Sequence, residues 1–484
     1  MKKNIILILN FIVTIPIYCS VGGLDTSFNP SGINTGTPGT VITAPAVFGA
    51  TSAASALAIA LQSNGKIVAG GTSHNPSGFA IAVYNTDGSL DTTFNGTGTV
   101  TNSFAAQVNG IAVQNDNKIV GVGTNNSLNG GFSIARYNTN GTLDTTFNGT
   151  GMVTTNFSSS FGALSRAVAT SVLIQPIDQK IVVAGTLSTT SPNLEQFLIA
   201  RYTTTGALDT SFNGTGFINI TPSTFGTFTR AEVTAVSLQS DGKIIVTGNV
   251  STGAPGNSSI ALARLNANGT LDTTFNPGVG AGFNGVEVTS ASAFGSGFQL
   301  VQSLALSIQN DNKIITAGVI EDSLFNESFA IARYNPDGTL DTTFNGTGTQ
   351  VTQAGITFSQ ANGVGIQSTG KIVVAGEADD ISGNTVVALA RYNTDGTLDL
   401  TFGTNGIVIT PPSSFNAVSE AIAQGLVIQT DDKIVIAGFS DSITTPASAS
   451  SFALARYIGS ITPTPIVSCL TNLNQAIIEK YRIV

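Results

Sequence analysis

The chain has 484 residues and a formal net charge of -9, with 10% charged and 41% hydrophobic residues. So few charges argue against a highly charged disordered chain, and the lack of a basic excess makes nucleic acid a poor partner. Gly, Thr, Ser and Asn mixed with Val, Ile and Phe are typical of an all-β protein.

Residues 1–21 predict a secretory signal peptide, because Lys2 and Lys3 precede a short apolar run and then small residues. The run is shorter than the ~20 apolar residues that cross a membrane, so we expect no transmembrane span once the signal is removed. The protein is therefore expected to be exported, to the periplasm, the cell surface or the medium. Cleavage is expected near Cys19, with lipidation of Cys19 as the alternative. Cys469 is the only other cysteine, so no disulfide is expected to hold the fold.

Two short patterns then alternate along the chain. The first resembles LQSDGKIIVTG and carries a lysine in each copy: Lys66, Lys118, Lys180, Lys243, Lys313, Lys371 and Lys433. The second resembles FAIARYNPDGTLDTTF and carries an aspartate: Asp91, Asp144, Asp209, Asp272, Asp341 and Asp399, with an isolated Asp25. Repeats of this length indicate one supersecondary unit per copy.

Each pattern is read as a β-hairpin, giving four short antiparallel strands per copy. In the fifth copy, residues 304–309 and 313–317 form the first hairpin, and 329–334 and 339–344 form the second around an Asn-Pro-Asp-Gly turn. Residues 150–154, in the second copy, either extend the outer strand or add a fifth. Tandem four-stranded units predict a seven-bladed β-propeller over residues 22–459.

The two ends of the repeat array are complementary. Residues 24–28 match a fourth strand without its first three, and the last copy stops after residues 452–457 without a fourth. We expect the N-terminal strand to complete the last blade, which removes two open sheet edges and pairs Asp25 with Arg456. Residues 460–484 are expected to form a Pro/Thr linker and a short, possibly helical tail, which docks on the propeller, anchors the protein or assembles with a partner.

The motifs GKIVxAG and ARYNxDGTLDTTF, with a period of roughly 60 residues, resemble the delta-60 repeat β-propeller family of bacterial proteins. The resemblance covers about residues 22–458. It implies a β-propeller fold and a frequent exported context, and it supplies no activity or catalytic residues. The first copy departs from the pattern, with Val83 where the other copies have arginine.

The repeated charged residues are interpreted as structural. An arginine stands eight residues before the aspartate, as in Arg333 and Asp341, so the two should pair across the hairpin. The phenylalanine of each copy, such as Phe147, is expected to pack between blades. No catalytic, cofactor or metal site is expected, because His74 is the only histidine and no ligand cluster or nucleophile motif is present; calcium remains an open alternative.

The longer and more variable connections fall on one face, where binding residues usually concentrate. Acidic residues gather in its loops: Glu195, Glu321, Asp322, Glu327, Glu377, Asp379, Asp380 and Asp441. They form either a solvated rim or a patch for a cation or basic partner. We predict a non-enzymatic binding or surface-interaction module with a protein or glycan ligand on this face. The alternatives are a carbohydrate-active hydrolase or lyase and a structural envelope component.

Overall fold

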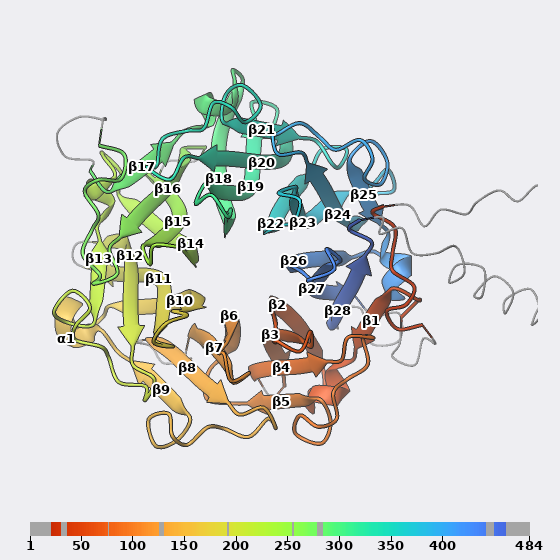
Figure 1. Ribbon diagram of the computed structural model, residues 1–484, viewed down its shortest axis with the longest axis horizontal. Helices are drawn as coiled ribbons and strands as arrows, with labels where there is room; N and C mark the ends of the chain where they lie inside the picture. The colour runs from red at the N-terminus through yellow and green to blue at the C-terminus, as the bar shows by residue number, and fades with distance from the viewer. Residues whose placement is uncertain are drawn as a thin grey trace, which may run out of the picture.

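The protein is all-β in the computed structural model, which describes residues 21–30, 36–75, 77–124, 130–190, 193–253, 256–277, 284–441 and 450–460. Nearly all of the expected signal peptide, including Cys19, and the tail with Cys469 lie outside these residues. No helix within the described ranges is long and apolar enough to cross a membrane. Figure 1 shows small sheets arranged one after another around a common centre.

Most of the chain forms four-stranded antiparallel units, named here by their strands. The first half of the chain contains β2 (Ala53–Leu61), β3 (Ile67–His74), β4 (Gly78–Tyr84), β5 (Thr99–Asn102), β6 (Gln107–Val113), β7 (Ile119–Thr124), β8 (Phe132–Tyr137), β9 (Met152–Thr155), β10 (Arg166–Ile174), β11 (Ile181–Thr190), β12 (Asn193–Tyr202) and β13 (Phe217–Ile220). The second half contains β14 (Arg230–Leu238), β15 (Ile244–Ser251), β16 (Ser258–Leu265), β17 (Val286–Thr289), β18 (Phe298–Ile308), β19 (Ile314–Asp322), β20 (Glu327–Tyr334), β21 (Thr349–Thr352), β22 (Ser359–Ile366), β23 (Ile372–Asp379), β24 (Thr385–Tyr392), β25 (Ile407–Thr410), β26 (Ala421–Ile428), β27 (Ile434–Asp441) and β28 (Ser450–Tyr457).

Five sheets have four strands and one has eight. The eight-stranded sheet consists of two four-stranded runs, β10–β13 and β14–β17, joined by a single parallel bridge between Glu195 and Arg230. Helical turns occupy some connections: α1 (Ser158–Phe161) and the 3-10 turns Pro45–Phe48, Pro222–Thr224, Ala291–Phe294 and Pro412–Phe415.

The fourth strand of each unit differs from the one predicted. The LDTTF segment makes only an isolated bridge, such as Tyr334 with Leu340, and then turns. The outer strand follows later, and in this unit it is β21, paired with β20. Residues 150–154 likewise contain most of β9, the fourth strand of their unit, and do not extend an earlier strand. The prediction failed because the Asp341 side chain accepts a hydrogen bond from the amide of Thr343, two residues later, and so folds the chain into a turn.

The N-terminal segment joins the last sheet by the same scheme. Leu24 forms a bridge with Tyr457, and β1 (Thr40–Thr43) pairs antiparallel with β28. The strand that completes this sheet is therefore β1 and not the predicted residues 24–28. The expected contact between Asp25 and Arg456 is present, with Nε and Oδ2 2.8 Å apart.

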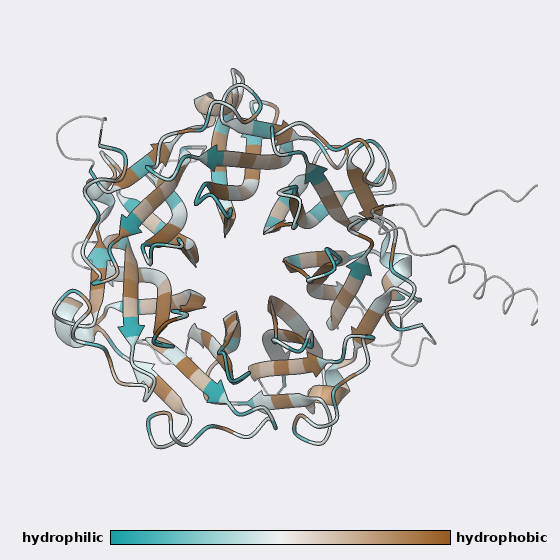
Figure 2. Cartoon of the chain, in the orientation of Figure 1, coloured by the Kyte–Doolittle hydropathy of each residue, from teal (hydrophilic) through white to brown (hydrophobic). Residues whose placement is uncertain are grey.

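The hydrophobic core lies between neighbouring units. Val68 and Ile81 of unit β2–β5, for example, pack with Val108 of the next unit. Figure 2 shows hydrophobic segments along the strands of every sheet and hydrophilic ones at many strand ends and loops. β4 and β28 are almost entirely buried, because both of their faces are covered. Their sequences therefore read as nearly continuous apolar runs.

Candidate functional site

The strand directions divide the polar side chains between two ends of the molecule. The repeat-turn end carries the short turns from the first to the second strand and the longer third-to-fourth connections, which include the LDTTF segment or its counterpart. The loop end carries the connections from the second to the third strand and from the fourth strand to the next unit. Each end has its own electrostatic arrangement.

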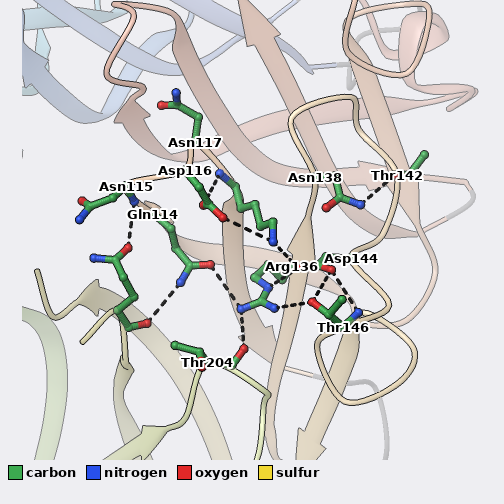
Figure 3. A network of polar contacts seen from close by, with 12 residues as sticks. Gln114, Asn115, Asp116, Asn117, Arg136, Asn138, Thr142, Asp144, Thr146 and Thr204 are labelled. Atoms are coloured by element: carbon green, nitrogen blue, oxygen red, sulfur yellow. Dashed lines mark hydrogen bonds and ion pairs between the residues drawn. The ribbon is translucent and has the colours of Figure 1, made fainter. Parts of the chain in front are cut away.

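At the repeat-turn end, the repeated aspartate is the acceptor of a buried cluster (Figure 3). Asp144 Oδ2 lies 2.8 Å from Arg136 Nε and 3.1 Å from Lys118 Nζ, while its Oδ1 accepts from the amide and hydroxyl of Thr146. The lysine is a partner that sequence reasoning missed, although it recurs in every copy. The predicted eight-residue Arg–Asp pairing is confirmed.

The arginine also connects each unit to the next. Arg136 Nη1 donates to the backbone carbonyl of Thr204 in unit β10–β13, at 2.7 Å, and its guanidinium lies 4.7 Å from the centre of the Phe147 ring. Phe147 is fully buried, and the turn glycine Gly206 of the next unit comes close to its ring. The phenylalanine thus packs between units as predicted.

The cluster keeps its carboxylate ionised. Burial alone would raise the pKa of Asp144, but the hydrogen bonds from Thr146 and Lys118 and the charge of Arg136 hold that pKa at about 2. Hydrogen bonds and ion pairs of this kind recur at Asp209, Asp272, Asp341, Asp399 and Asp25. These ion pairs and hydrogen bonds stabilise the fold, and the lysines and arginines neutralise the aspartates.

Unit β2–β5 is the exception, because Val83 occupies the position of the arginine. Asp91 therefore has no arginine opposite it, and Lys66 Nζ lies 2.6 Å from its Oδ2. A pocket of about 260 Å³ lies beside Asp91 and is lined by Gln62, Asn64, Lys66, Asp91, Thr93, Asn117, Thr139 and Asn140.

The loop end is strongly acidic. Its charged residues include Glu195, Glu232, Glu321, Asp322, Glu327, Glu377, Asp379, Asp380, Glu420 and Asp441, and its basic residues within the described ranges are Arg166 and Arg230. The aspartates serve the loops: Asp379 accepts the backbone amides of residues 356–358, and Asp441 those of residues 418–420. The glutamates supply the remaining negative charge of the loop end.

Three of these glutamates form what we call the acidic arc: Glu327, Glu377 and Glu420, from three consecutive units. Burial, followed by the nearby carboxylates of Glu420 and Glu327, raises the pKa of Glu377. Burial and Glu321 raise the pKa of Glu327, and burial and Asp441 raise that of Glu420. Burial is the largest cause in all three, repulsion by a neighbouring carboxylate adds to it, and none of the three has an ion-pair partner among the described residues.

A second pocket of about 300 Å³ lies at the loop end between unit β14–β17 and β18. Its lining includes Arg230, Glu232, Asn249 and Gln302. Burial and the adjacent Glu195 raise the pKa of Glu232 to about 7. Sequence analysis did not single out Glu232, because Glu195 belongs to a different unit and only the bridge between β12 and β14 brings the two together. No cluster of three or more potential metal ligands occurs in the part of the chain that is described.

Six segments match the family described as "Domain of unknown function (DUF5122) beta-propeller", at residues 62–94, 114–147, 178–212, 239–275, 309–344 and 367–402. These six segments are similar to β-propeller repeats. Each matched segment runs from the first-hairpin turn to the phenylalanine of the LDTTF segment or its counterpart. The family's description assigns no activity, and no curated protein matches the chain.

Solved structures that the chain resembles include a polysaccharide lyase, at 12% identity and a TM-score of 0.44 over 83% of this chain and 89% of that one. They also include a gluconolactonase from Xanthomonas campestris (11% identity, TM-score 0.33, 75% and 92% covered) and a Trypanosoma rangeli sialidase (9%, 0.35, 89% and 58%). These proteins are enzymes, which corrects the expectation that the chain is not one: the lack of a sequence motif does not exclude catalysis. At TM-scores below 0.5 the likeness carries no further argument about this chain, and it does not favour a carbohydrate-active reading.

Proposed function

We propose that the protein is an exported, closed seven-bladed β-propeller of the delta-60 repeat type that binds a basic partner through its loop end. The seven four-stranded units, counting β1 with β26–β28, would be the blades. The contacts of β2 with both β6 and β26, and the pairing of β1 with β28, support closure of the ring. The signal-like residues 1–21 support export.

The uneven division of charge carries the binding proposal. At the repeat-turn end lysines and arginines neutralise the buried aspartates, whereas the loop end has Arg166 and Arg230 against its many carboxylates. The internal stretches outside the described residues contain no charged residue, so they do not alter this balance. A surface of one sign attracts a partner of the opposite sign and discriminates against like charge.

Binding of a lysine-rich peptide to the signal-free chain tests this proposal, measured by calorimetry at low and at physiological salt. In one variant the acidic arc is neutralised by Glu327→Gln, Glu377→Gln and Glu420→Gln. The matched control carries Asp116→Asn, Asp178→Asn and Asp241→Asn, which change the net charge equally at exposed positions of the repeat-turn end.

We expect the arc variant to weaken binding about tenfold and the control about twofold or less, with affinity falling as salt rises. Equal weakening by both variants would mean that the peptide responds only to net charge, and the loop-end proposal would be wrong. An acidic peptide of the same length should not bind measurably.

A further inference from the structure

Six units hold an arginine guanidinium in the same set of acceptors. Its Nε donates to the aspartate at 2.7–2.8 Å, and its Nη1 donates to a turn carbonyl of the neighbouring unit. In five of the six, Nη2 donates to the Ser or Thr hydroxyl two residues after the aspartate. A phenylalanine ring lies beneath each guanidinium, 4.6–4.8 Å away.

The backbone of unit β2–β5 follows the same plan around Val83. Val83 pairs with Val68 as Arg136 pairs with Val120, and the amide of Asp91 donates to the Val83 carbonyl at 2.8 Å, as that of Asp144 does to the Arg136 carbonyl at 2.9 Å. The substitution of valine for arginine therefore shortens one side chain without changing the frame around it.

The acceptors of the missing guanidinium remain and line the 260 Å³ pocket. Asp91 and Thr93 correspond to Asp144 and Thr146, Gln62 to Gln114, and Thr139 to Thr204 of the neighbouring turn. Asn64 and Asn140 are exposed, so the pocket opens to solvent. Asp91 itself is buried, with 5% of its surface accessible.

The charge of this pocket also leaves room for one more cation. In five of the six other units the lysine also pairs with an aspartate two residues before it, and Asn64 takes that position here. Asp399 of unit β22–β25 nevertheless accepts from both Lys371 and Arg391 where that second aspartate is also replaced, whereas Asp91 has Lys66 alone as an ion-pair partner among the described residues. A planar guanidinium with five fixed N–H donors matches acceptors that diverge in this way, and a compact ammonium does not. The volume is below the ~300–1,000 Å³ of sites for drug-sized ligands, and so it suits a single group or side chain.

We propose that this pocket binds a guanidinium group from outside the chain, of the kind carried by an arginine side chain. The incoming group takes the position that the chain's own arginine occupies in the six other units. This site lies at the repeat-turn end and is independent of the loop-end binding proposed above.

Calorimetric titration of the signal-free chain with N-acetyl-arginine amide tests the proposal, with N-acetyl-lysine amide as the competing cation and an arginine-containing tripeptide as the polypeptide form of the ligand. We expect one site per chain that prefers arginine amide over lysine amide at least tenfold. Equal or tighter binding of the tripeptide would identify the source as a polypeptide, and markedly weaker binding would identify it as a free small molecule.

Three variants test the location of the site. Val83→Arg should fill the pocket with the chain's own side chain and abolish binding, and Asp91→Asn should weaken binding at least tenfold. Arg136→Val should create a second pocket and raise the stoichiometry from one to two, since the chain already tolerates valine at the equivalent position. No binding to the wild-type chain, equal binding of arginine and lysine amides, or unchanged binding in both Val83→Arg and Asp91→Asn would overturn the proposal.

Discussion

At the scale of single residues, the buried cluster around Asp341 is asymmetric. Asp341 accepts from both Arg333 and Lys313, so its removal leaves two cations, one of them buried, without their shared partner. Loss of Arg333 leaves the Asp341–Lys313 pair, the arrangement already present around Asp91. We expect Asp341→Ala to lower the free energy of unfolding by about 3–5 kcal/mol and Arg333→Met by only about 1–2 kcal/mol. Urea denaturation measures both, and a larger loss for Arg333→Met would contradict the ranking.

A second prediction at this scale concerns the turn glycines. Gly338 has a φ of +95°, and a Cβ there would lie 2.7 Å from the Phe275 ring of the preceding unit. Gly346 also has a positive φ, +76°, but a Cβ there would meet nothing within 4 Å. Gly338→Ala should therefore lower the free energy of unfolding by about 1–3 kcal/mol more than Gly346→Ala does. Gly346→Ala is the control, because it introduces the backbone strain without the contact. Equal unfolding midpoints for the two variants would show that the contact with Phe275 is unimportant.

At the scale of the elements, the sequence predicted three of the four strands in each unit, because turn residues separate runs that are apolar or alternating. It misplaced the fourth, since LDTTF has the composition of a strand and turns only through the hydrogen bonds of its aspartate. The Arg–Asp pairing could be predicted from its constant eight-residue offset. The role of the lysine could not, because Lys66 and Asp91 are 25 residues apart and meet only once the sheet has formed.

The pairing of β1 with β28 gives a prediction about this last sheet. Val41 of β1 is fully buried opposite Leu454, so removal of β1 exposes an apolar sheet edge. A chain that begins at residue 44 should lose hydrogen-exchange protection across β28 and unfold at least about 3 kcal/mol more easily than a chain that begins at residue 22. Retained protection around Leu454 in the shorter chain would show that β28 is stable without this neighbour.

At the scale of the whole molecule, two groups of carboxyls oppose each other in their effect of pH on stability. The repeat-turn aspartates have lowered pKa values, about 2 for Asp144 and Asp341, so their stabilisation is complete above pH ~4 and is lost as the pH falls towards 2. The pKa values of Glu232 at the loop end and Glu287 on β17 are raised to about 7, so the folded chain holds protons that the unfolded chain releases from pH ~4.5 upward.

Stability should therefore peak near pH ~4.5–5, fall steeply in acid, and decline gently, by on the order of 1 kcal/mol, between about pH 5 and pH 7.5. Urea midpoints measured from pH 2.5 to 8 give this profile. Glu287→Gln should flatten the neutral limb and leave the acid limb unchanged, because the substituted amide no longer titrates. Asp341→Asn should instead reduce the acid limb. A profile that rises steadily to pH 8, or a neutral limb unaffected by Glu287→Gln, would show that these glutamates ionise without cost to the fold.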